Sequence, residues 1–354
     1  MDARLLIVGM GAATPIGRSV WSSAAAARAG LCGFCEHPFM IDTAGEPMRV
    51  ARAPWLEIAL EGSARYGALL LPALDAAIEP LRTLPERERP RLALMLALPP
   101  PRPGVPADLI PSLRDTLAER LAGICGRIEC FAAGHAGGHL ALEAAVRACS
   151  GNALDAVLVA GADSYLAPET LEWIESCDQL HGAGPLNNAW GFIPGEAAGA
   201  LLLATDACAA RRRLDAFGEV AGLGLGRETC PIKTDTVCIG AGLTAAFRAA
   251  LANLAPAERI HNVFCDLNGE PYRADEYGFA SLRTQERFRA ATEFIAPADC
   301  WGDIGAAGVP LHIALALIAQ RKRYGKGPLS LVWASSESGE RGAAVIRGLD
   351  PVMR

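Results

Sequence analysis

The sequence predicts an α/β protein made of two related halves that share buried central helices. Of its 354 residues, 51% are hydrophobic, but only 6% are aromatic and 20% are charged. The core must therefore consist mainly of Ala, Leu, Val and Ile, a mixture that suits helices packed on buried parallel strands. Two further observations support this fold class: one structural plan occurs twice along the chain, and the chain opens with a strand, a turn and a helix.

The repeated plan is a small-residue turn, an apolar helix and a strand. The first copy, GHAGGHLALEAAVRACSG, opens on Gly137 and Gly138 and precedes the apolar run LDAVLVAGAD. The second copy, GAAGVPLHIALALIAQRKR, precedes PLSLVWASSE. Because the helices over 136–148 and 306–319 are apolar on most of their circumference, each must lie between layers. The repeat therefore predicts two halves that share these helices.

The first strand and turn contain a partial nucleotide-binding pattern. The apolar run over 5–8 ends in Gly9-Met10-Gly11, and Ser19 is placed to cap a helix that runs to Ala29. The third glycine position of the GxGxxG fingerprint holds Thr14, however. A dinucleotide cofactor is therefore not expected.

Bulk properties exclude several classes of function. The net charge of −6 and the sequence pI of about 5.6 argue against a nucleic-acid partner. The sequence has no apolar run long enough to span a membrane and no export signal at its start, so we expect a cytoplasmic protein. The eleven cysteines are an odd number and are expected to be reduced. Cys32 and Cys35 have CxxC spacing, but without a second such pair we predict neither a metal site nor a cofactor.

Three segments carry a resemblance to a known family. IVGMGAATPIG (7–17), LDAVLVAGAD (154–163) and above all GFIPGEAAGALLL (191–203) resemble the β-ketoacyl (3-oxoacyl-ACP) synthases of the thiolase superfamily. The resemblance extends over nearly the whole chain. It implies the thiolase fold, in which two βαβαβαββ halves form a five-layered α-β-α-β-α body. We expect the halves to comprise residues 1–210 and 211–354.

The Cys-His-His set with which these enzymes condense acyl groups is not found at the matching positions. The family's nucleophilic cysteine opens the first buried helix, where this sequence has His135 or, with one inserted residue, Gly134. The first catalytic histidine corresponds to Asn268 and the second to Gly302, which lies between Trp301 and Asp303. The resemblance thus predicts a fold without the chemistry that usually accompanies it.

Two more family features are absent. The lysine of the second histidine motif is missing, and the phenylalanine of the Gly-Phe-Gly-Gly gating loop corresponds to Ser338. Cys300 is either a pocket thiol or a small buried hydrophobe. The predicted pocket residues are the following: His135, His139, Asn268, Cys300, Trp301, Asp303 and Ser338.

Three other segments look like surface structure. The proline-rich stretch over 99–106 is typical of a surface loop or lid. The segment 178–188 is expected to be a loop near the pocket entrance. The charged residues within 271–277 are interpreted as ion pairs on a loop rather than as ligand contacts.

Two functional interpretations follow. In the first, the protein is a pseudoenzyme of fatty acid or polyketide biosynthesis that binds an acyl or related small group, or acts as the non-catalytic partner of an active ketosynthase. In the second, it is an acyltransferase of the 3-oxoacyl synthase type with an altered active site for thioesters. By analogy with the family, we expect a homodimer, or a heterodimer with a ketosynthase, that meets an acyl carrier protein or acyl-CoA.

Overall fold

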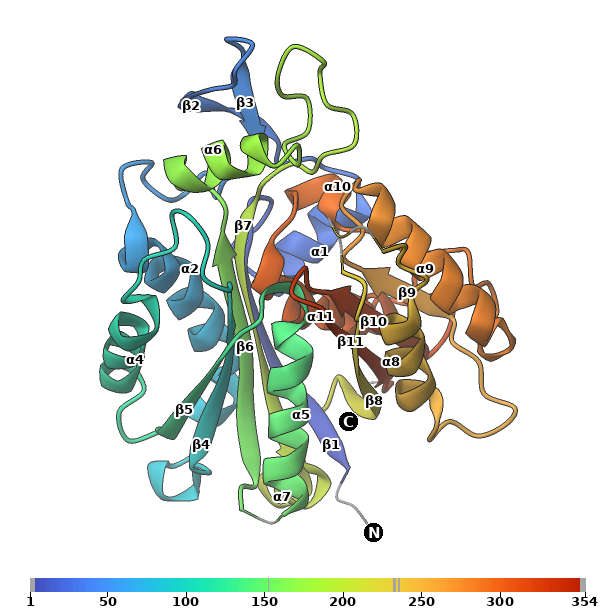
Figure 1. The fold of residues 1–354 in the computed structure, drawn as a ribbon. Coiled ribbons are helices and arrows are strands. Elements are labelled where there is room, and N and C mark those ends of the chain that lie inside the picture. Colours follow the sequence, from blue (N-terminus) through green and yellow to red (C-terminus); the bar gives the residue numbers. More distant parts are fainter. Residues whose placement is uncertain (1–3, 152, 232–233, 235, 351–354) are drawn as a thin grey trace.

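The computed structural model describes residues 4–151, 153–231, 234 and 236–350. Residues 1–3, which belong to the N-terminal segment in which no export signal was predicted, lie outside the described residues. Within this part of the chain, the strands form a nine-stranded sheet in the order β5-β4-β6-β7-β1-β8-β11-β10-β9 (Figure 1) and a separate β2–β3 hairpin. The strands are β1 (Leu5–Ala13), β2 (Cys35–Ile41), β3 (Pro47–Val50), β4 (Leu92–Leu98), β5 (Cys125–Ala132), β6 (Ala156–Ser164), β7 (Glu196–Thr205), β8 (Gly218–Arg227), β9 (Asn262–Cys265), β10 (Leu329–Ser335) and β11 (Glu340–Gly348).

The large sheet consists of two halves with matching topology. In the first half, β7 is antiparallel to β6 and β1, whereas β4 is parallel to β5 and β6. In the second half, β11 is antiparallel to β10 and β8, and β10 is parallel to β9. Where the first half has β5, the described residues of the second half have two isolated parallel bridges, Ile260 to Phe288 and Phe264 to Ile295. The predicted internal repeat is therefore present, and its second copy has a shortened outer strand.

The helices cover the sheet on the outside and fill the space between its halves (Figure 1). In chain order they are α1 (Val20–Arg28), α2 (Gly62–Ala77), α3 (Glu79–Arg82), α4 (Leu109–Arg120), α5 (Gly137–Ser150), α6 (Pro168–Ser176), α7 (Asp206–Arg212), α8 (Ala241–Leu251), α9 (Pro271–Thr284), α10 (Ala298–Trp301) and α11 (Gly308–Arg321). Three hydrophobic cores separate the layers: α2 and α4 pack on the first half, α5 and α11 lie between the halves, and α8 and α9 pack on the second half. This is the predicted α-β-α-β-α arrangement.

The two central helices differ in how deeply they are buried. Every residue of α11 from Gly308 to Ala319 is buried, as its apolar sequence predicts. Helix α5 is buried on the face that contacts β4 and β6, but it exposes Glu143 and Arg147, whose side chains are 40% and 68% exposed. Both helices therefore separate the halves, and α5 also borders the solvent.

Each central helix begins against a polar side chain from the opposite half. Short 3₁₀ turns, Gly134–Ala136 and Gly305–Ala307, precede α5 and α11. The Ala136 N–H donates to Ser336 Oγ at 2.8 Å, and the equivalent Ala306 N–H donates to Asp163 Oδ2 at 3.0 Å. These bonds satisfy N–H groups that a helix start leaves without partners.

The glycines of the first strand serve helix packing. A Cβ added to Gly9 would lie 2.1 Å from the Ala77 carbonyl oxygen, and one added to Gly11 would lie 1.8 Å from that of Ala73. Helix α2 thus approaches β1 too closely for any side chain at these two positions. The partial GxG pattern therefore has a structural explanation. As predicted, Ser19 caps α1, in a reciprocal arrangement with Ser22.

A smaller cap covers the end of the sheet where β6 and β10 terminate (Figure 1). It consists of the β2–β3 hairpin, α6 and the segment 177–195, held together by a separate apolar cluster that includes Val50, Leu171 and Phe192. None of the helices in the described residues is long and apolar enough to cross a membrane. The cap positions the roof of the cavity described below.

Candidate functional site

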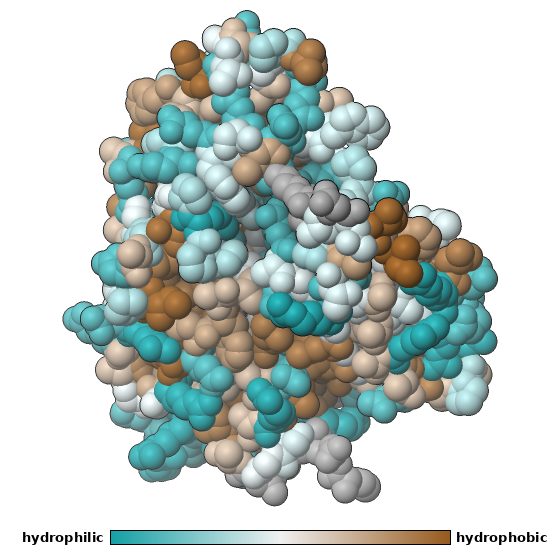
Figure 2. Space-filling model, viewed as in Figure 1, coloured by the Kyte–Doolittle hydropathy of each residue, from teal (hydrophilic) through white to brown (hydrophobic). Residues whose placement is uncertain are grey.

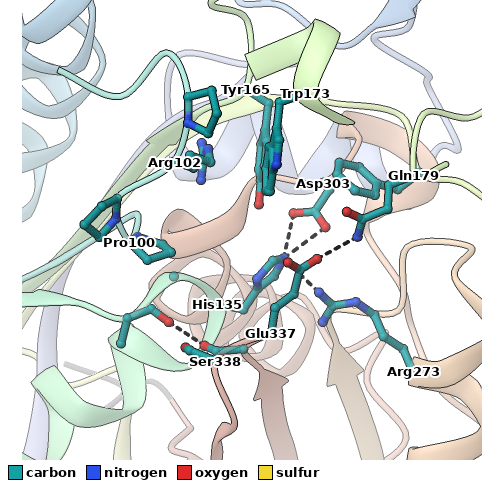
Figure 3. A pocket seen from close by; sticks show the side chains of 16 residues that line it. Pro100, Arg102, His135, Tyr165, Trp173, Gln179, Arg273, Asp303, Glu337 and Ser338 are labelled. Atoms are coloured by element: carbon teal, nitrogen blue, oxygen red, sulfur yellow. Dashed lines mark hydrogen bonds and ion pairs between the residues drawn. The ribbon is translucent and has the colours of Figure 1, made fainter. Parts of the chain in front are cut away.

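The candidate site is a cavity of about 390 Å³ at the start of α5, beneath the cap (Figure 3). Its lining comes from the proline-rich segment after β4, the turn before α5, the cap, α9, the segment before α11, and the β10–β11 turn. The lining residues are Pro100, Pro101, Arg102, Pro103, Ala133, Gly134, His135, Tyr165, Trp173, Gln179, Phe192, Arg273, Asp303, Ser336, Glu337 and Ser338. Both halves of the molecule therefore contribute to one cavity.

His135 lies at the floor of this cavity, in the turn that joins β5 to α5. Gly134 makes the turn possible because its φ of +64° lies in the left-handed region that glycine adopts readily. Ser336 fixes the same turn from the opposite half, since its Oγ donates to the Ala133 carbonyl and accepts from the Ala136 N–H. The backbone thus holds His135 at the helix start, as the sequence resemblance predicts.

His135 forms a buried pair with Asp303. Its Nε2 lies 2.8 Å from Oδ1 and 2.9 Å from Oδ2 of Asp303. A carboxylate accepts hydrogen bonds only, so Nε2 must be the donor. The carboxylate also accepts bonds from Asn268 Nδ2 at 2.7 Å and from the Gly305 N–H at 2.8 Å. Each of these donors therefore stabilises the charged form of Asp303.

The pKa values of the pair move apart. Burial alone would lower the pKa of His135, but the Asp303 carboxylate more than offsets this effect and raises the pKa above its ordinary value. Burial alone would raise the pKa of Asp303, but the charge and hydrogen bond of His135, together with Arg273, hold it well below its usual range. The site favours an imidazolium paired with a carboxylate.

Arg273 is the second cation of the floor, and sequence reasoning missed it. Its side chain is fully buried at the start of α9, where Nη1 donates to Asp266 Oδ2 and to the Ser335 carbonyl oxygen, both at 2.8 Å. Nη2 lies 3.3 Å from His135 Nε2, and these two nitrogens both carry protons. The prediction of a loop over 271–277 was wrong, because Pro271 begins a helix whose inner face is buried. The predicted charge pairing is present, and Arg273 and Glu276 form their ion pairs in the interior.

Glu337 completes the floor from the β10–β11 turn. Gln179 Nε2 donates to Glu337 Oε1 and to Glu270 Oε1, both at 2.7 Å, so one amide group serves two carboxylates. Glu270 is also bound by Asn268 and Arg273. Among the described residues, Glu337 has no cationic partner and no hydrogen bond other than that from Gln179.

Arg102 occupies the opposite wall, in the proline-rich segment over 99–106. Its Nη2 donates to Asp163 Oδ1 at 2.6 Å and to the Ser164 carbonyl oxygen at 3.0 Å. Its guanidinium lies over the Tyr165 ring, with Cζ 3.9 Å from the ring centroid. Arg102 and Arg273 thus have similar places in the two halves, because Arg102 bonds the carbonyl of the last residue of β6 and Arg273 bonds that of the last residue of β10.

The structure gathers some of the predicted pocket residues and separates others. His135, Asn268 and Asp303 lie together, and Ser338 lies at the exposed rim, where its Oγ donates to Glu340. Gly302 contributes backbone only. Trp301 lies with His135 and Asn268 around a separate space of about 10 Å³ and stacks on His312.

His139 and Cys300 lie away from the cavity. His139 is fully buried on α5, bonds the Val332 carbonyl oxygen through Nε2, and has its pKa lowered by burial to about 4. The Cys300 thiol is directed at the Ala27 carbonyl oxygen, 3.8 Å away, and burial raises its pKa. Neither residue is among those that line the cavity.

The residues that sequence reasoning missed are Arg102, Tyr165, Trp173, Gln179, Phe192, Arg273 and Glu337. Two signals in the sequence point toward some of them. Arg102 is the only charged residue between Pro99 and Pro106, and Gln179 lies within the loop expected at the pocket entrance. Both positions would have been reasonable candidates.

A possible metal cluster lies outside this cavity. Glu228, Cys238 and Glu276 bring one ligand atom each within 4.8 Å of one another. Glu276 is already paired with Arg341 and accepts a bond from Ser335, while Glu228 accepts bonds from backbone N–H groups that include that of Gly242. Because these carboxylates are already satisfied, the cluster is explained without an ion.

Sequence comparison identifies no relative: no protein-family model matches the chain, and no curated protein matches it. Structural comparison does. A chain in the complex of a type II polyketide synthase acyl-carrier protein with its ketosynthase matches with a TM-score of 0.82 and 16% identity, covering 99% of this chain and 100% of that one.

Two further structures agree. The ishigamide ketosynthase/chain length factor matches with a TM-score of 0.69 and 20% identity, covering 98% of this chain and 99% of that one. The ketosynthase from module 6 of the Bacillus subtilis bacillaene synthase matches with a TM-score of 0.79 and 17% identity, covering 98% of this chain and 72% of that one. The protein therefore has the thiolase-type fold shared by ketosynthases and chain length factors.

Proposed function

We propose that this protein is a non-condensing member of the ketosynthase-like proteins, whose cavity binds a small group instead of forming carbon–carbon bonds. The observation that supports this most directly is the His135–Asp303 pair, because the family resemblance matches His135 to the nucleophilic cysteine of condensing enzymes. A condensing site needs a nucleophile and groups that polarise a thioester. Here His135 is paired with Asp303, and Asn268 donates to the same carboxylate.

The cavity offers no substitute thiol. None of its lining residues is a cysteine, and the buried Cys300 is directed away from it. The other residues at the former histidine positions are an amide, Asn268, and a glycine, Gly302, and neither can transfer a proton near neutral pH. Decarboxylative condensation therefore lacks its chemical groups.

His135 is also poorly suited to replace the cysteine. A nucleophile or general base needs an unprotonated nitrogen, whereas the Asp303 carboxylate favours the imidazolium. Its Nε2 is already engaged by both carboxylate oxygens. The pair is therefore better suited to hold charge and shape at the cavity floor than to attack a thioester.

The proposal includes a partner. Strand β5 lies at the outer end of the large sheet, and most of its residues are only partly buried. Unpaired strand edges of this kind are pairing surfaces. We propose a dimer through β5, with a second copy or with an active ketosynthase, and an acyl carrier protein as a further partner. The matched structures include a carrier-protein complex and a ketosynthase/chain length factor pair. The division into residues 1–210 and 211–354, and a cytoplasmic location, remain predictions.

The second candidate is an acyltransferase that acts on thioesters with an altered site. The observation in its favour is again His135, because a carboxylate that fixes one nitrogen of an imidazole is also how many enzymes orient a general base. On this view His135 would act at a pH above its raised pKa. Asn268 would then position Asp303.

The test is to incubate the purified protein with acyl and malonyl thioesters of coenzyme A and of a carrier protein, following intact mass and released product. We expect neither adduct nor 3-ketoacyl product from the wild type, His135→Ala or Cys300→Ala. An adduct or product lost in one variant would establish the enzymatic alternative and identify the nucleophile. Co-purification with a ketosynthase would support the partner role.

A further inference from the structure

We propose that the cavity binds a small zwitterion of the amino-acid type, with its ammonium group at Glu337 and its carboxylate at Arg102. This inference rests on the proposed binding function and specifies its ligand. It follows from two groups of opposite charge that line the same cavity, each with an atom to which the structure gives no partner among the described residues. It requires no chemistry from the protein beyond binding.

Glu337 supplies the first unsatisfied group. Its Oε1 accepts the bond from Gln179, but the structure gives Oε2 no donor and the carboxylate no cation among the described residues. Every other carboxylate near the floor is bound by an arginine or by His135. Glu337 lines the cavity and is only partly buried, so its second carboxylate oxygen is open to a cationic ligand.

Arg102 supplies the second. Its side chain is only 5% exposed, and its Nε is a buried donor without an acceptor. Only Nη2 makes hydrogen bonds, and both of these go to the Asp163–Ser164 corner. Buried donors of charged groups are seldom left without acceptors. A ligand carboxylate could accept from Nη1, to which the structure gives no acceptor among the described residues.

The charges that line the cavity disfavour a simple anion beside Glu337. Three cationic side chains, Arg102, His135 and Arg273, and two carboxylates, Asp303 and Glu337, line the cavity. Each of the three cations is paired with a carboxylate, Asp163, Asp303 or Asp266. Glu337 is left as the lining carboxylate without a cation among the described residues, and it would repel an anion that did not also bring a positive group. A zwitterion supplies that group and still offers a carboxylate to Arg102.

The walls between the two groups are aromatic. Tyr165, Trp173 and Phe192 line the cavity, and Tyr165 and Phe192 pack edge to face with centroids 5.5 Å apart. Figure 3 shows the Tyr165 and Trp173 side chains above the floor, with Arg102 on one side and Glu337 below. Aromatic faces attract an ammonium group and pack against an apolar side chain. The volume of about 390 Å³ suits a compact ligand.

The test measures binding to the full-length protein by calorimetry and thermal shift, using each standard amino acid separately. For the tightest one, the matched acid without the amine and the matched amine without the carboxylate are measured too. We expect the zwitterion to bind about tenfold or more tightly than either matched compound, because each lacks one charged contact. Glu337→Gln should weaken binding of the amino acid by a similar factor and leave binding of the matched acid unchanged.

Control variants separate binding from folding. Glu340→Gln alters a carboxylate of the same turn that already bonds Arg227 and Ser338, so it should leave binding unchanged. Arg102→Lys keeps the charge but loses the planar guanidinium, and the paired change Arg102→Gln with Asp163→Asn avoids a buried unpaired charge. The variant that retains the wild-type melting temperature is then tested for binding. It should no longer bind the zwitterion more tightly than the matched amine.

Two results would overturn the inference. The first is no binding of any amino acid up to about 10 mM, the range of very weak affinities, by a folded protein. The second is equal binding of the zwitterion and the matched acid, unchanged in Glu337→Gln. Either result leaves the non-condensing proposal standing if thioesters still give no adduct. An acyl adduct on His135 would instead refute that proposal, whatever the amino acids do.

Discussion

Glu196 and Arg341 occupy the same register position in the two halves of the sheet and carry opposite charges. Glu196 pairs with Ser164 across β7 and β6, and Arg341 pairs with Ser335 across β11 and β10. Each forms a buried ion pair with an outer helix: Glu196 with Arg65 of α2, and Arg341 with Glu276 of α9. The serine of each pair donates to the carboxylate. The two halves thus have an equivalent buried ion pair, in which the acidic and the basic position are exchanged.

Breaking the first of these pairs should be costly. Glu196→Gln leaves the Arg65 guanidinium buried without its counter-ion, and we expect the free energy of unfolding to fall by about 3 to 5 kcal/mol in urea titrations. Replacing both residues, Arg65→Met with Glu196→Met, removes both charges and should cost less than the single change. A single change that costs under about 1 kcal/mol, the range of surface pairs, would contradict the buried geometry.

The His135–Asp303 pair should give stability a particular pH dependence. The pKa of His135 is raised by folding, so its contribution is complete below its unfolded pKa and is lost as pH rises through the folded pKa. The pKa of Asp303 is lowered, so its contribution is present above its unfolded pKa and lost as pH falls through the folded pKa. The pair should stabilise most between about pH 4 and 6.5, the two unfolded values.

The measurement is the difference in unfolding free energy between wild type and Asp303→Asn across this pH range. We expect the difference to peak in mildly acidic buffer and to shrink as the pH rises beyond the folded pKa of His135. His135→Asn should show the same profile, because either change removes the same pair. A difference that grows steadily with pH would contradict the assignment of the imidazolium.

His312 should have the opposite effect. Burial lowers its pKa to about 3, so in the folded state it stays neutral while the unfolded chain takes up a proton below about pH 6.5. Stability is therefore lost as the pH falls from that value toward the folded pKa. His312→Phe keeps a ring to stack on Trp301 and should lose less stability over the same acid range. Equal acid sensitivity of variant and wild type would contradict this role.

The contact between the central helices allows a matched pair of glycine substitutions. A Cβ at Gly138 would lie 2.5 Å from Val309 Cβ, so Gly138→Ala should destabilise by about 1 to 3 kcal/mol through overpacking. Gly67 lies within α2 with no neighbour within 4 Å of an added Cβ, so Gly67→Ala should raise stability by up to about 1 kcal/mol. Thermal and urea unfolding of the two variants should move in opposite directions.

Local patterns were sufficient to predict most of the architecture. Ser19 lies at a helix start that its side chain caps, and the repeated turn, helix and strand correspond to η2–α5–β6 and η4–α11–β10. Here η2 and η4 are the 3₁₀ turns Gly134–Ala136 and Gly305–Ala307. These features depend on residues close in sequence. The convergence of His135, Asn268 and Asp303 required the family resemblance in addition, because they come from three separate segments.

The remaining site residues depend on contacts that sequence patterns do not contain. The burial of Arg273 arises from Asp266 and from the end of β10, more than sixty residues away. Glu337 is defined as a site residue by the cap, which brings Gln179 over the β10–β11 turn. Charged residues are ordinarily on the surface, so a sequence pattern assigns them there unless their tertiary partners are known.

The helix starts that are fixed from the opposite half have a consequence for how the protein unfolds. Ser336 holds the start of α5, and Asp163 holds the start of α11. Neither half alone could complete its own central helix, and each would expose that helix's apolar surface to water. The two halves should therefore melt in a single cooperative transition, and the chain behaves as one folding unit despite its internal duplication.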